Sequence, residues 1–255
     1  MAQPTRPYYS SKGVSAVYYD LLTAADKKLL GDLEVYAGLA NGPSQILELG
    51  AGTGRIAVDL AQRGHSVLGL DIAPAMLDQA EAKRKALDPK TAARLRFKLG
   101  DMASLALGET FDLVLCTYFT LAHVPAGAAW KNTFKGVAKH LRPGGLAAFH
   151  LPVEERMRES PPPSDKPVFM HPLDGGGAVA LYILEHSFNP KLGRMDLVMD
   201  FVTRPASGAV AVHSHERLTY YLADPVPFAD AAGLEVAMAP IDVGGVGAIH
   251  VFRKP

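Results

Sequence analysis

Three closely spaced glycines follow a short apolar run of the sequence and could serve a ligand. Residues 45–49 (QILEL) lead directly into Gly50, Gly52 and Gly54, and a second apolar run, residues 66–70, ends at Asp71. Glycines after a buried strand let the backbone turn tightly and approach a ligand closely. In open α/β sheets ligands bind beyond the carboxyl ends of the strands, so these residues predict a ligand site at that edge.

The residues around the glycines discriminate between three ligands. A P-loop requires Gly-Lys-Ser/Thr after its second glycine, whereas Arg55 and Ile56 follow Gly54 here. A dinucleotide site requires its third glycine at position 55, one place later than Gly54. Glu48 would repel a pyrophosphate but could help to hold the ammonium group of an amino-acid moiety. S-adenosylmethionine carries that ammonium and no phosphate, and Asp71 could accept hydrogen bonds from its ribose. The pattern therefore favours S-adenosylmethionine as the cofactor.

Strand and helix patterns alternate between residues 45 and 151. Strands are predicted over residues 45–49, 66–70, 94–99, 111–116 and 146–151, and helices over 55–62, from Pro74 onward and over 130–141. Such alternation predicts parallel βαβ units in a doubly wound sheet. Ahead of this region, the spacing of apolar residues predicts a helix within residues 14–39.

The pattern changes after residue 152. Residues 179–188, 194–203 and 210–221 are rich in β-branched and aromatic residues, and two hairpin-type loops separate them, which predicts an inserted antiparallel unit of three or four strands. A helix over 225–232 and strands over 234–239 and 248–252 then complete the core. The predicted fold is α/β and Rossmann-like, with a doubly wound, seven-stranded, mostly parallel sheet. Its parts are a helical lid (1–40), a cofactor-binding core (41–153), the insert (154–222) and the completion of the core (223–255).

Composition limits the partners and the compartment. The 255 residues include 26 basic and 26 acidic side chains, so no broad positive surface for nucleic acid or an anionic membrane is expected. A single cysteine, Cys116, excludes an intrachain disulfide framework and fits a reducing compartment. No run approaches the roughly 20 apolar residues of a membrane span, and no secretory signal begins the chain, so a cytoplasmic protein is expected.

Five motifs in order resemble those of class I S-adenosylmethionine-dependent methyltransferases, and in particular the small-molecule N-methyltransferases of the methyltransferase domain 25 type. They are residues 46–55, 68–71 with 74–77, 100–102, 111–116 and 141–145. The resemblance implies a cofactor site in which Asp101 follows the strand predicted over residues 94–99 and accepts a hydrogen bond from the adenine amine. The residues assigned to cofactor binding are Tyr18, Glu48, Gly50, Gly52, Gly54, Arg55, Asp71, Ile72, Met76, Asp101, Met102 and Cys116. For Cys116 a buried position near the cofactor is expected, not a nucleophile.

The same resemblance implies in-line methyl transfer, in which positioning matters most and a base is optional. The loop over residues 117–124 faces the methyl group in the family, so Tyr118 and His123 are the first catalytic candidates. His150, at the end of the strand predicted over residues 146–151, is the third. Each histidine has a purely structural alternative as a capping or packing residue. An N-terminal helix carrying Tyr18 is expected to close over the cofactor as a lid.

The insert favours a small-molecule acceptor, most simply an amine nitrogen, bound by a monomer or homodimer. An O- or C-methyltransferase is the alternative within the class; a nicotinamide-dependent oxidoreductase and a non-catalytic S-adenosylmethionine-binding protein are alternatives outside it. His213 and His215 have a spacing compatible with metal binding, but alternation on a solvent-facing strand explains them more simply, and no metal is expected.

Overall fold

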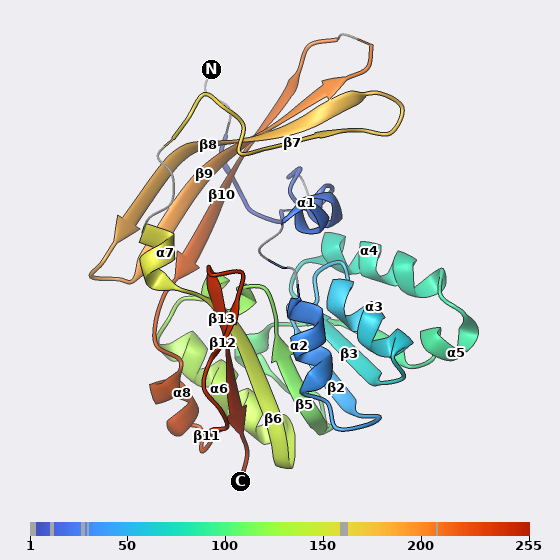
Figure 1. Ribbon diagram of the computed structural model, residues 1–255, viewed down its shortest axis with the longest axis vertical. Coiled ribbons are helices and arrows are strands. Elements are labelled where there is room, and N and C mark those ends of the chain that lie inside the picture. The colour runs from blue at the N-terminus through green and yellow to red at the C-terminus, as the bar shows by residue number, and fades with distance from the viewer. Residues whose placement is uncertain (1–3, 11–12, 27–28, 30, 159–162, 208) are drawn as a thin grey trace.

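A computed structural model describes residues 4–10, 13–26, 29, 31–158, 163–207 and 209–255. The chain forms two β-sheets, one above the other, and helices flank the lower sheet (Figure 1). The predicted α/β, Rossmann-like class with an inserted antiparallel unit is confirmed. Among the described residues, no helix is long and apolar enough to cross a membrane.

The lower sheet, called the core sheet, has eight strands. Its order is β11-β13-β6-β5-β2-β3-β4, and β12 pairs with β13. The strands are β2 (Gln45–Leu49), β3 (Ser66–Asp71), β4 (Leu95–Leu99), β5 (Phe111–Cys116), β6 (Leu141–Pro152), β11 (Glu235–Val236), β12 (Ile241–Val243) and β13 (Gly247–Arg253). Strands β2 to β6 pair in parallel, whereas β13 is antiparallel to β6. The predicted count of seven omits β12, whose three residues are too few for a periodic signal.

Helices cover both faces of the core sheet. Because its strands are buried on both sides, their residues are apolar on both sides. One face packs Trp130 and Phe134 of α6 (Ala128–His140) with α8 (Val226–Asp230). The other face packs Ile56 and Leu60 of α3 (Arg55–Gln62) with Tyr36. Helix α4 (Pro74–Lys85), the short α5 (Pro89–Ala92) and α7 (Glu154–Arg158) complete the helices after α3. The carboxyl ends of the parallel strands are thereby held at one edge.

The upper sheet, called the roof sheet, has the order β1-β10-β9-β8-β7. Its strands are β1 (Arg6–Pro7), β7 (Phe169–Pro172), β8 (Gly177–Asn189), β9 (Arg194–Pro205) and β10 (Val212–Tyr221). The three long predicted strands correspond to β8, β9 and β10. The sheet has five strands because β7 pairs with β8, and because β1, from the chain's N-terminal segment, pairs in parallel with β10.

The N-terminal region differs from the single predicted helix. Two short helices, α1 (Tyr19–Ala25) and α2 (Asp32–Gly38), replace it. Gly31 precedes α2 with a φ of 91°, a left-handed conformation that interrupts a continuous helix. Helix α2 packs on the core sheet, whereas α1 lies between the two sheets (Figure 1).

Candidate cofactor and acceptor site

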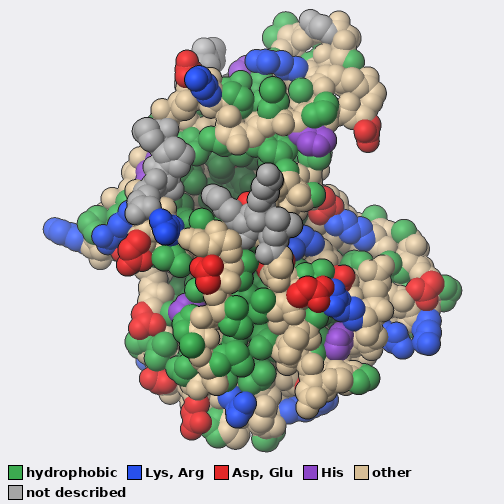
Figure 2. All heavy atoms as spheres, viewed as in Figure 1, with side chains coloured by type: hydrophobic (Ala, Val, Ile, Leu, Met, Phe, Trp, Pro, Cys, Tyr) green, Lys and Arg blue, Asp and Glu red, His purple; other side chains and the backbone are tan. Residues whose placement is uncertain are grey.

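A cavity of about 820 Å³ lies between the core sheet and the roof sheet. Figure 2 shows hydrophobic side chains around a hollow beneath the roof sheet. One part of the lining, called the glycine half, comes from residues 50–103, after strands β2, β3 and β4. The other part, called the tyrosine half, comes from residues 7–10, 19, 118–129 and 217–219. Small-molecule sites span about 300–1,000 Å³, so the volume suits a cofactor together with a substrate.

The glycine turn after β2 has a left-handed backbone at each of its three glycines, with φ values of 68°, 56° and 81°. Gly50 and Gly52 line the cavity. A Cβ on Gly50 would lie 2.0 Å from Cγ2 of Thr120, and one on Gly54 would lie 2.8 Å from the Phe97 ring. Gly50 and Gly52 therefore bring backbone to the cavity, whereas Gly54 permits close packing against the core.

Asp71 at the end of β3 fixes the glycine turn. Its Oδ2 accepts a hydrogen bond from the Gly52 N–H at 2.8 Å, and its Oδ1 accepts one from the Ala73 N–H at 2.8 Å. Burial raises the pKa of this carboxyl, and the backbone hydrogen bonds oppose that shift. Because each carboxylate oxygen has a second lone pair, Asp71 can accept further hydrogen bonds from a ligand in the cavity.

The other predicted residues of the glycine half also line the cavity. Asp101 caps a short 3-10 helix (Met102–Ser104), with Oδ1 accepting from the Ala103 N–H at 2.8 Å. Met76 is buried beneath Gly52, whereas Ile72 is 70% exposed. Met102 completes this wall, so an exposed carboxylate and apolar side chains converge at one end of the cavity.

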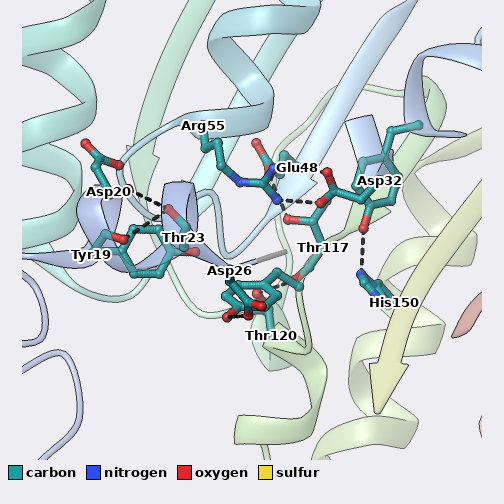
Figure 3. A network of polar contacts seen from close by, with 12 residues as sticks. Tyr19, Asp20, Thr23, Asp26, Asp32, Glu48, Arg55, Thr117, Thr120 and His150 are labelled. Carbon is teal, nitrogen blue, oxygen red and sulfur yellow. Dashed lines mark hydrogen bonds and ion pairs between the residues drawn. The ribbon is translucent and has the colours of Figure 1, made fainter. Parts of the chain in front are cut away.

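Glu48 and Arg55 lie behind the glycine turn and outside the cavity lining (Figure 3). Glu48 is 1% exposed, and its Oε1 accepts a hydrogen bond from Thr117 at 3.0 Å. Its Oε2 has no hydrogen-bond partner among the described residues, and burial raises the carboxyl pKa to about 8. Both carboxylate oxygens of Asp32 bind the Arg55 guanidinium, at 3.0 and 2.5 Å. Direct contact between Glu48 and a ligand ammonium stays a prediction, because the side chain lies one layer below the cavity wall.

His150 and Cys116 are also placed beneath the cavity. His150 Nδ1 lies 3.0 Å from the Tyr36 hydroxyl, and its ring packs against Phe119 at 4.8 Å between centroids. Burial lowers the pKa of His150 to about 4 and raises that of the Cys116 thiol. Neither residue lines the cavity, so a catalytic role for His150 stays a prediction.

His123 and Tyr118 do face the cavity, in the tyrosine half. His123 belongs to a 3-10 helix (Thr120–His123), and burial lowers its pKa to about 4. Tyr118 has a φ of 42° and Phe119 one of 63°, conformations that bulky residues rarely adopt and that cluster at functional sites. The Tyr118 hydroxyl donates to Asp26 Oδ2 at 3.1 Å, which joins this loop to the end of α1.

The helix α1 brings Tyr19 to the cavity, and not the predicted Tyr18, which precedes the helix. Asp20 holds the helix through Thr53 Oγ1 at 2.5 Å and Lys83 Nζ at 2.6 Å. At the other end, Glu216 of β10 accepts the backbone N–H groups of residues 14 and 15 through Oε1. The N-terminal segment is thus bound to the roof sheet, to the glycine turn and to α4.

Two residues of the tyrosine half have no signal in the sequence. Arg217 and Thr219 line the cavity from β10, and their position depends on how the roof sheet folds back over the core sheet. His213 and His215 of the same strand lie outside the lining, and their rings flank the Asp200 carboxylate at 2.6 and 3.7 Å. This shared contact with Asp200 accounts for their alternate spacing.

Known proteins resemble this chain in its central segment and in its fold. Residues 46–145 match the model of the family described as "Methyltransferase domain". The magnesium-protoporphyrin O-methyltransferase of Rhodobacter capsulatus is 39% identical over 71 residues, 28% of this chain and 30% of that protein. The cypemycin N-terminal methyltransferase of Streptomyces sp. is 32% identical over 102 residues, 40% of this chain and 39% of that protein. The matches thus span less than half the length of these relatives.

A solved structure resembles nearly the whole chain. The sugar N-methyltransferase KedS8 of Streptoalloteichus sp. has a TM-score of 0.71 at 19% identity, covering 100% of this chain and 98% of that one. At this identity the likeness shows the fold, which includes both the core sheet and the roof sheet. The family match identifies residues 46–145 as a methyltransferase domain. The fold of the whole chain agrees with the class predicted from the sequence, the class I S-adenosylmethionine-dependent methyltransferases.

Proposed function

We propose that this protein transfers the methyl group of S-adenosylmethionine to the amine nitrogen of a small molecule. Supporting this, a single cavity joins the glycine turn and Asp71 to a chamber of neutral aromatic side chains. The observation that carries the choice of an amine is the environment of His123. This histidine faces the chamber, but burial lowers its pKa to about 4.

The glycine half fits the cofactor. Gly50 and Gly52 leave room that a Cβ would occupy, and the Asp71 oxygens keep lone pairs for ribose hydroxyls. Asp101, next to Met102, presents a carboxylate that can accept from an exocyclic amine. When bound, S-adenosylmethionine supplies an electrophilic methyl group on a sulfonium. The chain's own contribution is to position that methyl group and to exclude water around it.

The acceptor chemistry follows from the strength of the available base. A general base works best when its pKa lies near the operating pH, so a histidine with a pKa of about 4 removes a hydroxyl proton poorly. A neutral amine needs no strong base, since its lone pair is already available. Neutral His123 can still accept a hydrogen bond from the amine N–H and orient its lone pair. These properties favour nitrogen over oxygen as the acceptor atom.

Matched acceptors provide the test. We expect purified protein to release S-adenosylhomocysteine with amines, and not with alcohols or phenols of the same carbon skeleton, as measured by mass spectrometry of both products. Two of the similar proteins are named as an N-methyltransferase and as an N-terminal methyltransferase, which is consistent with nitrogen as the acceptor atom. The Rhodobacter protein is named as an O-methyltransferase. Methylation of only the hydroxyl compounds would make O-methyl transfer the activity. Cofactor binding without turnover of any acceptor would indicate a binding protein.

A further inference from the structure

Aromatic rings form a continuous wall around the tyrosine half of the cavity. Tyr9 is at its centre, with ring centroids 4.2 Å from Tyr8, 5.6 Å from Tyr19 and 5.8 Å from His123. Tyr118 lines the same half from the loop after β5. Three separate segments of the chain therefore contribute rings to one chamber. Packing a single lid helix on the core would not require rings from all three.

The rings of this wall are uncharged. Burial raises the pKa of the phenols of Tyr8, Tyr9, Tyr19 and Tyr118 well above the usual range, so all four remain neutral. Among the described residues that line this half, none carries a carboxylate. A positive ligand here would find ring faces, whose negative electrostatic potential attracts cations most strongly when water is excluded.

Arg217 is the charged side chain in the described lining of this half, and its charge is partly offset. The residue is exposed, and its Nη1 lies 3.9 Å from Asp196 Oδ1. Asp196 also binds Arg194 at 2.8 Å and accepts from Thr219 at 2.6 Å. On the opposite side, Asp26 accepts the Tyr118 hydroxyl, which adds electron density to that ring.

We propose that the tyrosine half is an aromatic cage for an alkylated ammonium group, so that the acceptor is a secondary or tertiary amine. This inference rests on the proposed function. Without a carboxylate in the wall, replacing N–H by N–CH₃ sacrifices no charged hydrogen bond. The larger and softer cation keeps its contacts with the rings.

The transfer balances on this substrate class. The bound amine reacts in its neutral form, after its ammonium form has released a proton to water. The nitrogen lone pair then forms the new bond to the methyl carbon, and the carbon–sulfur bond breaks with its electron pair passing to sulfur. The positive charge moves from sulfur to nitrogen, next to the ring faces. The methylated product of a secondary amine then releases its proton to water. The methylated product of a tertiary amine is a quaternary ammonium ion and keeps its charge.

Choline and its uncharged carbon isostere, with a tert-butyl group in place of trimethylammonium, test the cage. Both are titrated by calorimetry into protein saturated with S-adenosylhomocysteine, so that the glycine half is filled. We expect choline to bind about 5-fold more tightly than the isostere, within the range of cation–π attraction. The variant Tyr9→Leu should abolish this difference and Tyr9→Phe should retain it. Tyr182→Leu, a change outside the described lining, is the matched control.

Several results would overturn the cage. They are equal binding of choline and its isostere, no binding of choline, or a preference that survives Tyr9→Leu. If Tyr9→Leu instead weakens S-adenosylmethionine relative to S-adenosylhomocysteine and leaves choline unaffected, the rings serve the sulfonium and not the acceptor. Unchanged affinity for S-adenosylhomocysteine shows that the variant is folded, and Tyr19→Leu provides a second variant.

Different results would refute the cage and the proposed function. Methylation of amines without a preference for choline would remove the cage alone. Recognition of choline without methylation of any amine would remove the proposed function alone. When amines are methylated, secondary amines should show higher kcat/KM than the primary amines of the same skeleton, and a preference for primary amines would also contradict the cage.

Discussion

Replacing Gly50 with alanine tests how closely the glycine turn approaches the loop after β5. The new Cβ would lie 2.0 Å from Cγ2 of Thr120, and the residue would keep a φ of 68°. The left-handed backbone costs about 1–2 kcal/mol for a residue with a Cβ. Overpacking adds about 1–3 kcal/mol, because the neighbouring loop must move. We therefore expect Gly50→Ala to lower the free energy of unfolding by about 2–5 kcal/mol.

The same substitution at Gly233 separates the two contributions. Gly233 has a φ of 76°, and a Cβ added there would meet no side chain or backbone atom of a packed neighbour within 4 Å, so Gly233→Ala should cost the backbone contribution alone. Urea unfolding followed by circular dichroism measures both variants. Adding Thr120→Ser to Gly50→Ala removes the methyl group in conflict, and should recover part of the loss. If Gly50→Ala costs no more than Gly233→Ala, the close approach inferred for this turn is incorrect.

Four further predictions concern the site. Asp71→Asn should weaken S-adenosylhomocysteine binding about 10-fold or more in calorimetry, since hydrogen bonds to charged groups are worth about 1.5–3 kcal/mol. Arg55→Met should destabilise the fold by about 3 kcal/mol in urea unfolding, because it leaves the buried Asp32 carboxylate unpaired. His123→Gln should lower kcat toward amines and leave S-adenosylhomocysteine affinity unchanged. Burial raises the Glu48 pKa from 4.5 to about 8, so the folded state keeps a proton that the unfolded state loses. The wild type should therefore lose stability relative to Glu48→Gln as pH rises from about 5 to 8, by at most about 1.4 kcal/mol per unit.

Matched controls make these results specific. Asp78→Asn on the exposed side of α4 should leave cofactor affinity unchanged, and Arg63→Met, which breaks exposed ion pairs, should cost less than about 1 kcal/mol. Glu109→Gln, at a half-buried carboxyl, is the matched control for Glu48→Gln. A pH-independent difference between Glu48→Gln and wild type would show that Glu48 is ionised in the fold. Full turnover by His123→Gln would make that histidine structural.

Local patterns were sufficient to predict the core sheet and the glycine half. Strands buried on both faces give continuous apolar runs, and the glycine turn and Asp71 lie at their ends by the geometry of parallel sheets. These features depend on neighbours in sequence. The residues Asp71, Asp101 and Met102 consequently line the cavity, as expected of residues that follow the strands of such a sheet.

Contacts between segments distant in sequence determine the features of the site that the sequence did not reveal. Whether Tyr18 or Tyr19 faces the cavity depends on where α1 begins, and no side-chain cap marks that position. The lining by Arg217 depends on pairing between segments about two hundred residues apart. The position of Glu48 also depends on a residue distant in sequence, because its carboxyl contacts Thr117 in the loop after β5 and lies beneath the glycine turn. Apolar periodicity carries no information about these contacts.

The parallel pairing of β1 with β10 has a consequence for the order of folding. Arg6 leaves the ribosome about two hundred residues before its partner Glu216. The βαβ units that hold the glycine turn need only contacts between neighbouring segments and can form during synthesis. Closing the aromatic chamber must wait until β10 has been synthesised, and contacts at such separation form slowly. A nascent chain can thus assemble the cofactor half of its site well before the acceptor half exists.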